Sequence, residues 1–518
     1  MSEQTSPTPE AATAAASPPN AAAQRLSVQY FIDLFKNHGP ELQIPLKPKK
    51  CAIVFAIGLI LWFLPCPETI NPETGKAFID PKGWKIMACF VATIASFLTG
   101  AMPMGVAVLL AVTVLGTLVL PVKDALSGFA SAQVWLIVMA FLISRGFVKT
   151  GLGLRIAYLF IKKLGSNPRG LALALGLTCF GLGSAMPSST ARAGTFMALI
   201  KSIAQGFGST AEHDRRKIGS YLMFCGFSMN YPTSASYMTA MAGNPLIIAF
   251  AAAAIGEGAL TWFKWWLWML VPGILCLVVT PWVISWIYPP QLKKSTEAQE
   301  MAKQKLAEMG PMNSAEWLML FAFILLLLLW VGGSFLGLNA TIAAFIGIMF
   351  LLLTGVLSWD DVTHEHSAYN CMFWYAGLLV MAPAMSKYGI IAWLTKDVNA
   401  WLHGMDWIWV IVILVMIIVE MSYVFASSTA FISALYPAFL GIALAANVPA
   451  DVAAISLAAV CNLKASMTYY TGGAAPVYFF QNFVTPNEWL RNGFIITHVH
   501  VLILLTVGMM WWKVLGLW

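Results

Sequence analysis

The sequence predicts an all-α protein that crosses a membrane with about eleven helices. Two observations predict this fold class. Of the 518 residues, 59% are hydrophobic and 10% are charged, and the mean hydropathy is +0.75, which is far too apolar for a soluble protein. The apolar residues also gather into separated runs, and many of these approach the roughly 20 residues that a spanning helix needs. The net charge of +7 is dispersed and indicates no nucleic-acid partner.

Two segments precede the first apolar run. Residues 1–26 are rich in Ala, Pro, Ser and Thr and lack the apolar core of a signal peptide, so we expect a disordered tail. A transit peptide is the alternative, but the tail contains acidic residues. Residues 27–50 form a predicted interfacial amphipathic segment, whose lysines include Lys47, Lys49 and Lys50. Basic residues before the first span place the N-terminus in the cytoplasm.

A charged segment divides the apolar runs into two halves. Residues 289–313 predict a helical linker on the membrane surface, between a first half at 51–288 and a second at 314–518. The apolar runs lie at 51–65, 86–102, 104–121, 131–148, 170–186, 217–255, 261–288, 316–336, 339–357, 370–386, 406–424, 450–485 and 494–516.

The two halves contain an internal repeat. Three landmarks recur at nearly the same separation along the chain: Lys149 and Lys387, Ser188 and Ser427, and Thr239 and Thr471. Such similar offsets are typical of duplicated transporter halves. Five predicted spans separate equivalent elements, and an odd number makes the two copies inverted in the membrane.

Each copy contains one Ser-Ser-Thr motif inside an apolar stretch. We call Ser188–Thr190 the first tip and Ser427–Thr429 the second tip. Each tip lies between two arms of about 16–20 residues. At a rise of 1.5 Å per residue, two such helical arms joined by a tight turn reach past the membrane midplane and return to the same side. We therefore predict re-entrant hairpins at 170–207 and 406–445. The apolar stretches at 217–255 and 450–485 hold Gly and Pro interruptions and predict broken helices.

The tips and the interruptions predict a substrate site for a small anion with more than one acidic group. A helix that begins inside the membrane presents free N–H groups and a positive dipole end, and hydroxyls add donors without charge. The predicted substrate-binding residues are Ser188, Ser189, Thr190, Ser427, Ser428, Thr429, Thr239, Asn244, Pro245, Thr471, Gly472 and Pro476.

Two cations lie close to these motifs. Arg192 follows the first tip by two positions, and Lys464 precedes the second interruption. Charges at membrane depth are rare and usually face a cavity, so we predict that both compensate the charge of a bound dianion. The alternative is a structural ion pair, for which Glu420 could serve as partner. His498 and His500 are interpreted as packing residues.

No motif for a metal, a cofactor or catalysis is visible. The eight cysteines are scattered singly, and we find no Walker A, GxSxG or HExxH sequence. We therefore predict a transporter and not an enzyme. A remote alternative is an intramembrane hydrolase with a tip serine as nucleophile, which would need a base within hydrogen-bond reach.

At these paired motifs the chain resembles the divalent-anion/sodium symporter superfamily, also described as dicarboxylate and citrate transporters. The resemblance covers about 51–516. The strings PSSTARAGT and MTAMAGNPL are most similar to the branch of 2-oxoglutarate/malate translocators and bacterial citrate or tartrate/succinate antiporters. The resemblance implies a homodimer, with a scaffold domain and a transport domain that moves as an elevator.

The chain departs from the family pattern at both tips. The family has Ser-Asn-Thr, whereas Ser189 and Ser428 stand at the Asn positions here. Since the family's Asn helps to form sodium sites, this difference favours a sodium-independent exchanger of di- or tricarboxylates in a bacterial inner membrane. Malate, succinate, 2-oxoglutarate, tartrate and citrate all remain candidate substrates. The alternative is a sodium-coupled symporter of the same superfamily.

Overall fold

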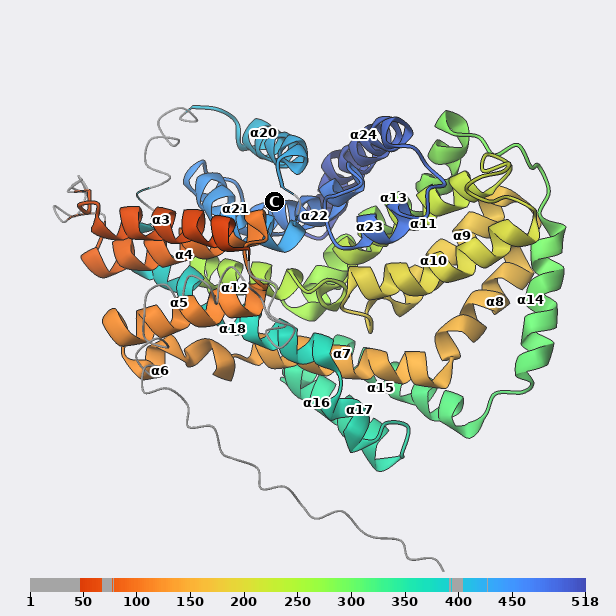
Figure 1. Ribbon diagram of the computed structural model, residues 1–518, viewed down its shortest axis with the longest axis horizontal. Helices are drawn as coiled ribbons and strands as arrows, with labels where there is room; N and C mark the ends of the chain where they lie inside the picture. Colours follow the sequence, from red (N-terminus) through yellow and green to blue (C-terminus); the bar gives the residue numbers. More distant parts are fainter. Residues whose placement is uncertain (1–46, 68–76, 78, 391–392, 394–403, 426) are drawn as a thin grey trace, which may run out of the picture.

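Helices make up the architecture of the chain in the computed structural model (Figure 1), which describes residues 47–67, 77, 79–390, 393, 404–425 and 427–518. The predicted tail and most of the interfacial segment therefore lie outside the described residues. Five described helices are long and apolar enough to cross a membrane, and five more are apolar but shorter. This agrees with the predicted all-α class.

The first half begins with four helices, of which the first three pack against one another in sequence order on one side of the molecule (Figure 1). They are α3 (Pro48–Phe63), α4 (Pro81–Thr99), α5 (Met104–Leu118) and α7 (Ala132–Thr150), with the short α6 (Val122–Ala125) and η1 (Ser127–Ala130) between the last two. Local chemistry sets their bounds. Asp80 caps α4 through the Lys82 amide, and Gly100 ends this helix in the left-handed conformation.

The rest of the first half contains the first predicted hairpin and the first predicted broken helix. After α8 (Leu152–Leu164), α9 (Pro168–Gly183) and α10 (Ser189–Gly206) occupy the hairpin segment. The broken segment consists of α11 (Gly219–Ser236), η2 (Met238–Ala240) and α12 (Asn244–Ile255), and α13 (Trp262–Ile287) follows. We call the non-α-helical residues 237–243 the first break.

The linker contains α14 (Thr296–Met309), which runs along one edge of the molecule against α8 (Figure 1). A buried ion pair joins α8 to the chain just after the linker, because Arg155 Nε lies 2.6 Å from Glu316 Oε1. Arg155 Nη1 also donates to the Gly310 carbonyl at 2.8 Å. Sequence alone does not reveal this pair, because its two members lie far apart along the chain.

The second half repeats the order of the first. It contains α15 (Ser314–Leu336), α16 (Ala340–Leu353), α17 (Trp359–Thr363) and α18 (His366–Lys387). The second hairpin segment consists of α20 (Trp407–Glu420), η3 (Met421–Tyr423) and α21 (Ser428–Ala445), and the second broken segment of α22 (Ala450–Leu463), η4 (Lys464–Ser466) and α23 (Ala474–Phe479). The last span consists of α24 (Pro486–Ile503), the π-helical η5 (Leu504–Gly508) and α25 (Met509–Val514). Residues 467–473 form the second break.

Candidate functional site

Both tips begin helices and are capped by their own first serine. Ser188 Oγ accepts a hydrogen bond from the Ala191 amide at 3.1 Å, and Ser427 Oγ accepts one from the Ala430 amide at 3.2 Å. A capping hydroxyl satisfies one of the free N–H groups at a helix start and leaves others available. Each tip therefore offers amide and hydroxyl donors at the positive end of a helix.

The two tips line one cavity of about 490 Å³. Its wall includes eight of the predicted substrate-binding residues: Ser188, Ser189, Thr190, Ser427, Ser428, Thr429, Gly472 and Pro476. Elements from the two halves of the sequence thus converge on the same space, as expected for the central site of a duplicated transporter.

The two copies touch each other at this cavity. A Cβ atom added to Gly473, in the second break, would lie only 2.0 Å from Thr190 Oγ1 of the first tip. Tyr231 of α11 donates from its hydroxyl to the Thr471 carbonyl at 3.3 Å. Glycine at position 473 therefore permits the first tip to lie directly against the second break.

The other four predicted residues hold the breaks together and do not line the cavity. Thr239 donates to the Ser184 carbonyl before the first tip, and Thr471 Oγ1 donates to the Ser422 carbonyl before the second tip at 2.9 Å. Asn244 Nδ2 donates to two carbonyls of the first break region, at 2.9 and 3.0 Å, and Pro245 lies in the first turn of α12. These residues connect each break to its surroundings.

Arg192 is fully buried, and its guanidinium donates to several oxygens of the described residues, with the Cys179 side chain also beside it. Its Nε and Nη2 atoms donate to Asn230 Oδ1 at 3.0 and 2.8 Å, and Nη2 donates to Ser234 Oγ at 2.6 Å. Nη1 donates to the carbonyls of Met186 and Ala240. Among the described residues no carboxylate pairs with Arg192, and the side chain is not part of the cavity wall. Its positive charge is therefore held by neutral oxygens behind the first tip.

Lys464 is also fully buried, but its ammonium is not hydrogen-bonded to any described residue. The Nζ atom lies 3.8 Å from the centroid of the Phe431 ring, at a distance typical of a cation–π contact. Lys464, like Arg192, is not part of the cavity wall. The two predicted cations thus lie behind the surface that the substrate would touch.

Glu420 pairs with a residue other than the two predicted cations. Its Oε1 atom lies 3.3 Å from Nε2 of His498, on the last span. The alternative of a Glu420 pair with Arg192 or Lys464 was therefore wrong. His498 also packs on its own helix, where its ring lies 4.1 Å from the Phe494 ring, centroid to centroid. His500 is buried, as expected for packing, and its Nε2 atom lies 2.8 Å from Thr280 Oγ1. Because they lie about half a helical turn apart, the two histidines face different partners.

Sequence reasoning missed a third wall of the cavity, formed by α18. The residues Ser367, Asn370, Cys371 and Trp374 line the cavity from this helix. Their spacing of three and four positions places them on one helix face. Ser367, Asn370 and Cys371 were visible in the sequence at or before the start of the apolar run at 370–386, but small polar residues are common in packed helices. Two tyrosines were also missed, since Tyr231 and Tyr470 line the same cavity.

Proteins of similar sequence cover nearly the whole chain. "Putative malate transporter YflS" of Bacillus subtilis (strain 168) is 42% identical over 487 residues, with 93% of this chain and 99% of that protein covered. "Dicarboxylate transporter 1, chloroplastic" of Spinacia oleracea is 38% identical, with 91% and 82% covered. "Inner membrane protein YbhI" of Escherichia coli (strain K12) is 33% identical, with 90% and 98% covered.

A solved structure shares the fold, and a family model matches almost the whole described chain. The crystal structure of the YdaH transporter of Alcanivorax borkumensis superposes with a TM-score of 0.51 at 9% identity, covering 90% of this chain and 98% of that one. The model described as "Sodium:sulfate symporter transmembrane region" matches residues 47–518. This chain is therefore an integral membrane transport protein that belongs to the sodium:sulfate symporter family, within the divalent anion:sodium symporter superfamily.

Proposed function

We propose that this protein exchanges di- or tricarboxylates across a bacterial inner membrane without sodium. The observation that carries the proposal is the position of the Arg192 guanidinium. It lies behind the first tip and donates hydrogen bonds to a group of neutral oxygens. Relatives named dicarboxylate and malate transporters support the substrate class.

The cavity suits an anion with two acidic groups. The first tip and the second tip approach it as separate helix starts, each with hydroxyl and amide donors. One carboxylate at each tip would receive charge-assisted hydrogen bonds and the favourable field of a helix N-terminus. Candidate substrates are malate, succinate, 2-oxoglutarate, tartrate and citrate.

The oxygen atoms around Arg192 are of the kind that coordinate sodium in transporters with broken helices. They are carbonyls of Met186 and Ala240, the amide oxygen of Asn230 and the hydroxyl of Ser234. A guanidinium in this place supplies a permanent positive charge and leaves no room for an exchangeable ion. The first copy therefore needs no sodium to balance a carboxylate.

Fixed charge explains why exchange is obligatory in this proposal. Arg192 and Lys464 leave the empty transport domain with two buried positive charges that no described carboxylate pairs. Moving such charges through hydrocarbon is costly, whereas a bound dianion cancels them. The transport domain then crosses the membrane, as an elevator, only with substrate bound. Each movement inward with one substrate must therefore be followed by a movement outward with another.

A sodium-coupled symporter is a second candidate, favoured by one observation in the second copy. Asn462 Oδ1, Ser466 Oγ and Ser428 Oγ are buried and have no hydrogen-bond partner among the described residues. When Thr239 is aligned with Thr471, Asn462 and Ser466 fall on the positions of Asn230 and Ser234. A single sodium ion could occupy this place, although the nearby Lys464 ammonium would repel it.

Counterflow in proteoliposomes tests the proposal. Vesicles that contain the purified protein and unlabelled malate should take up labelled dicarboxylate in sodium-free buffer, and vesicles loaded with buffer alone should not. Uptake that requires a sodium gradient but no internal dicarboxylate would favour the symporter. A panel of unlabelled acids in competition with one labelled dicarboxylate would rank the substrates.

The remaining parts of the proposal concern assembly and orientation. We propose a homodimer with a cytoplasmic N-terminus, based on family resemblance and on Lys47, Lys49 and Lys50 at the start of α3. Cysteine accessibility measured from each side of the membrane would test the orientation. Mass photometry of the purified protein would test the dimer.

A further inference from the structure

We propose that a groove between α3, α4 and α5 binds one chain of an anionic phospholipid, with the lipid phosphate at Lys47 and Lys50. This α3–α5 groove has a volume of about 350 Å³ and lies apart from the cavity between the tips. Its walls consist of Val54, Phe55, Gly58, Leu59, Trp62, Phe63, Ala88, Cys89, Ala92, Thr93, Ser96, Met102, Ala107, Leu110, Ala111, Val114 and Leu118.

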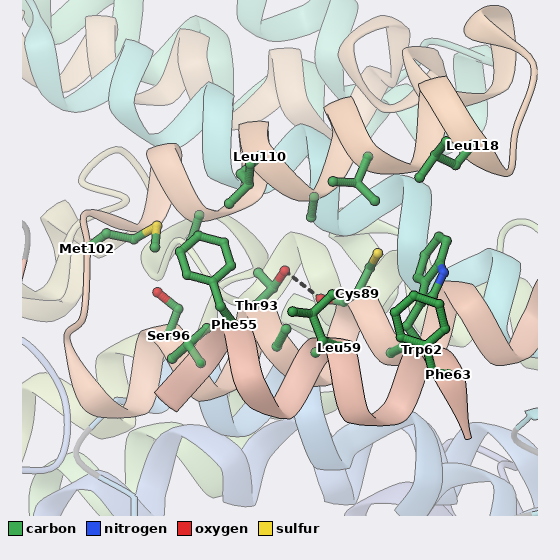
Figure 2. A pocket seen from close by; sticks show the side chains of 17 residues that line it. Phe55, Leu59, Trp62, Phe63, Cys89, Thr93, Ser96, Met102, Leu110 and Leu118 are labelled. Atoms are coloured by element: carbon green, nitrogen blue, oxygen red, sulfur yellow. Dashed lines mark hydrogen bonds between the residues drawn. The ribbon is translucent and has the colours of Figure 1, made fainter. Parts of the chain in front are cut away.

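The α3–α5 groove is apolar and open along one side. Figure 2 shows Phe55, Leu59 and Phe63 extending from α3 beside it, and these side chains are 47%, 57% and 79% exposed. The floor is tight, since a Cβ on Gly58 would lie 3.1 Å from Ala92 Cβ. A long, narrow, apolar channel with an open side fits an extended hydrocarbon chain.

The length of the α3–α5 groove fits one leaflet of a bilayer. Its residues on α3 extend from Val54 to Phe63, which at 1.5 Å per residue is roughly 14 Å. Half of a hydrocarbon core of about 30 Å is nearly the same length. One acyl chain could therefore lie in the groove while its head group stays at the membrane surface.

Ser96 provides a polar contact inside the α3–α5 groove. It is 1% exposed, lines the groove, and its hydroxyl has no hydrogen-bond partner among the described residues. Thr93, in contrast, satisfies its hydroxyl by donating to the Cys89 carbonyl at 2.8 Å. A buried hydroxyl without a partner is unfavourable, and an ester oxygen of a glycerolipid would accept its hydrogen.

Positive charge lies at the same end of the α3–α5 groove as Ser96. Lys50 Nζ donates to the Thr99 carbonyl at 2.7 Å, and Lys47 Nζ lies 3.8 Å from the position of a Cβ on Gly100. Both ammonium groups thus lie beside the loop that leads to Met102, and the ion pairs among the described residues include neither lysine. Clustered lysines next to a spanning helix attract anionic lipid head groups.

A second copy of the chain is a less suitable occupant of the α3–α5 groove. A two-fold axis normal to the membrane would place equivalent residues of both copies at the same depth. The lysines at the start of α3 would then face the same lysines of the other copy. Like charges repel, whereas a phosphate attracts them.

Native mass spectrometry of the purified full-length protein with added lipid tests this proposal. Phosphatidylglycerol should remain bound in preference to phosphatidylcholine with the same acyl chains. The double variant Lys47→Gln/Lys50→Gln should weaken phosphatidylglycerol retention by about 30-fold, from about 1 kcal/mol per lysine. Ser96→Ala should weaken retention of both lipids to a similar, smaller extent, since the ester group is common to both.

A matched control exists at the other end of α4. Lys82→Gln/Lys85→Gln also removes two cations, but from the end near Trp62, where Lys85 Nζ lies 5.3 Å from the Trp62 ring. This variant should change phosphatidylglycerol retention less than about twofold. Equal loss in both double variants, or equal retention of the two lipids by the unaltered protein, would overturn the proposal. A disulfide-linked dimer formed by Leu59→Cys would overturn it too, because it would identify a second copy as the occupant.

Discussion

The two copies of the repeat agree in their hydroxyl groups and differ in their cations. Ser188 and Ser427 cap their helices in the same way, and Thr239 and Thr471 bind carbonyls just before their own tips. In contrast, alignment of the two tips places Phe431 at the position equivalent to Arg192. The repeat therefore preserves the hydroxyl groups of the tips and breaks but not the source of positive charge.

The second copy obtains its cation from the opposite element. Lys464 belongs to the broken segment, and alignment of the two breaks places Pro232 at the equivalent position of the first copy. The Lys464 ammonium contacts the ring of Phe431, which stands in the place of Arg192. Each copy thus has one cation between its hairpin and its broken helix. The two copies therefore share a positive charge between hairpin and broken helix, although the residue position that supplies it differs.

The two cations also differ in how many hydrogen bonds they donate. The Arg192 guanidinium donates hydrogen bonds to four residues, whereas the Lys464 ammonium donates none to a described residue. A fully bonded guanidinium contributes to the structure as well as to the charge. The Lys464 ammonium has only the Phe431 ring as a contact of this kind, so we expect it to contribute less to folding than Arg192 and to act mainly through its charge. Mutations at the two positions should therefore separate stability from transport.

The largest effect is expected for Arg192→Met. It removes the cation and leaves several buried oxygens without donors, each of which costs about 1–3 kcal/mol. Exchange should be lost, and the melting temperature in detergent should fall clearly. Arg192→Lys should restore little of either, because an ammonium cannot reproduce the planar fork. A stable Arg192→Met protein with normal counterflow would contradict the assigned role.

The next largest effect is expected for Lys464→Met. Removal of a buried charge without hydrogen bonds should leave the melting temperature unchanged or higher, since burial of an unpaired charge is costly. Dicarboxylate counterflow should nevertheless fall more than about tenfold, which corresponds to a loss of about 1.4 kcal/mol of interaction with the dianion. Parallel thermal-shift and counterflow assays make the comparison. If Lys464→Met instead unfolds the protein, the contrast with Arg192 disappears.

A smaller effect is expected for Phe431→Leu. The variant keeps an apolar side chain but removes the aromatic face, and a buried cation–π contact is worth about 2 kcal/mol. The apparent affinity for a dicarboxylate should change because the Lys464 ammonium loses the ring that it contacts. Phe431→Tyr is the matched control and should behave like the unaltered protein. Equal counterflow affinities in all three proteins would show that the ring does not position Lys464.

The smallest effect is expected where the copies differ at the surface. Lys149 Nζ lies 2.5 Å from Asp361 Oδ2 and holds the pKa of that carboxyl well below its usual range, whereas the equivalent Lys387 lies 5.6 Å from the Tyr388 ring. Lys149→Met should cost less than about 1 kcal/mol at neutral pH, because the lysine is exposed. Since the carboxyl pKa is lowered, this contribution exists above its ordinary pKa of about 3.9 and declines as the pH falls below it.

Thermal unfolding measured against pH checks this last prediction. The difference between the unaltered protein and Lys149→Met should shrink as the solution is acidified. Lys387→Met serves as the control and should show no such dependence on a carboxyl group. A difference that persists unchanged at acidic pH would mean that Lys149 stabilises the protein by packing.

Much of the candidate site was predictable, because hydroxyls and prolines in hydrocarbon are conspicuous. The tips and their offsets led directly to the eight predicted residues that line the cavity. The face of α18 was missed because small polar residues such as Ser367 are common in packed helices and carry no specific signal. The partner of Glu420 was missed because the contact with His498 joins elements of different sequence regions.

The sequence by itself determined that this is a duplicated membrane protein with two polar tips, since composition, periodicity and repeat offsets are local or additive properties. Only the tertiary structure decided what each charged side chain touches. Arg192 reaches the Ala240 carbonyl in the first break, and Lys464 reaches the ring of Phe431 on another helix. Such partners depend on how helices distant in sequence pack together, because a buried charge binds whichever oxygens or rings that packing brings within reach.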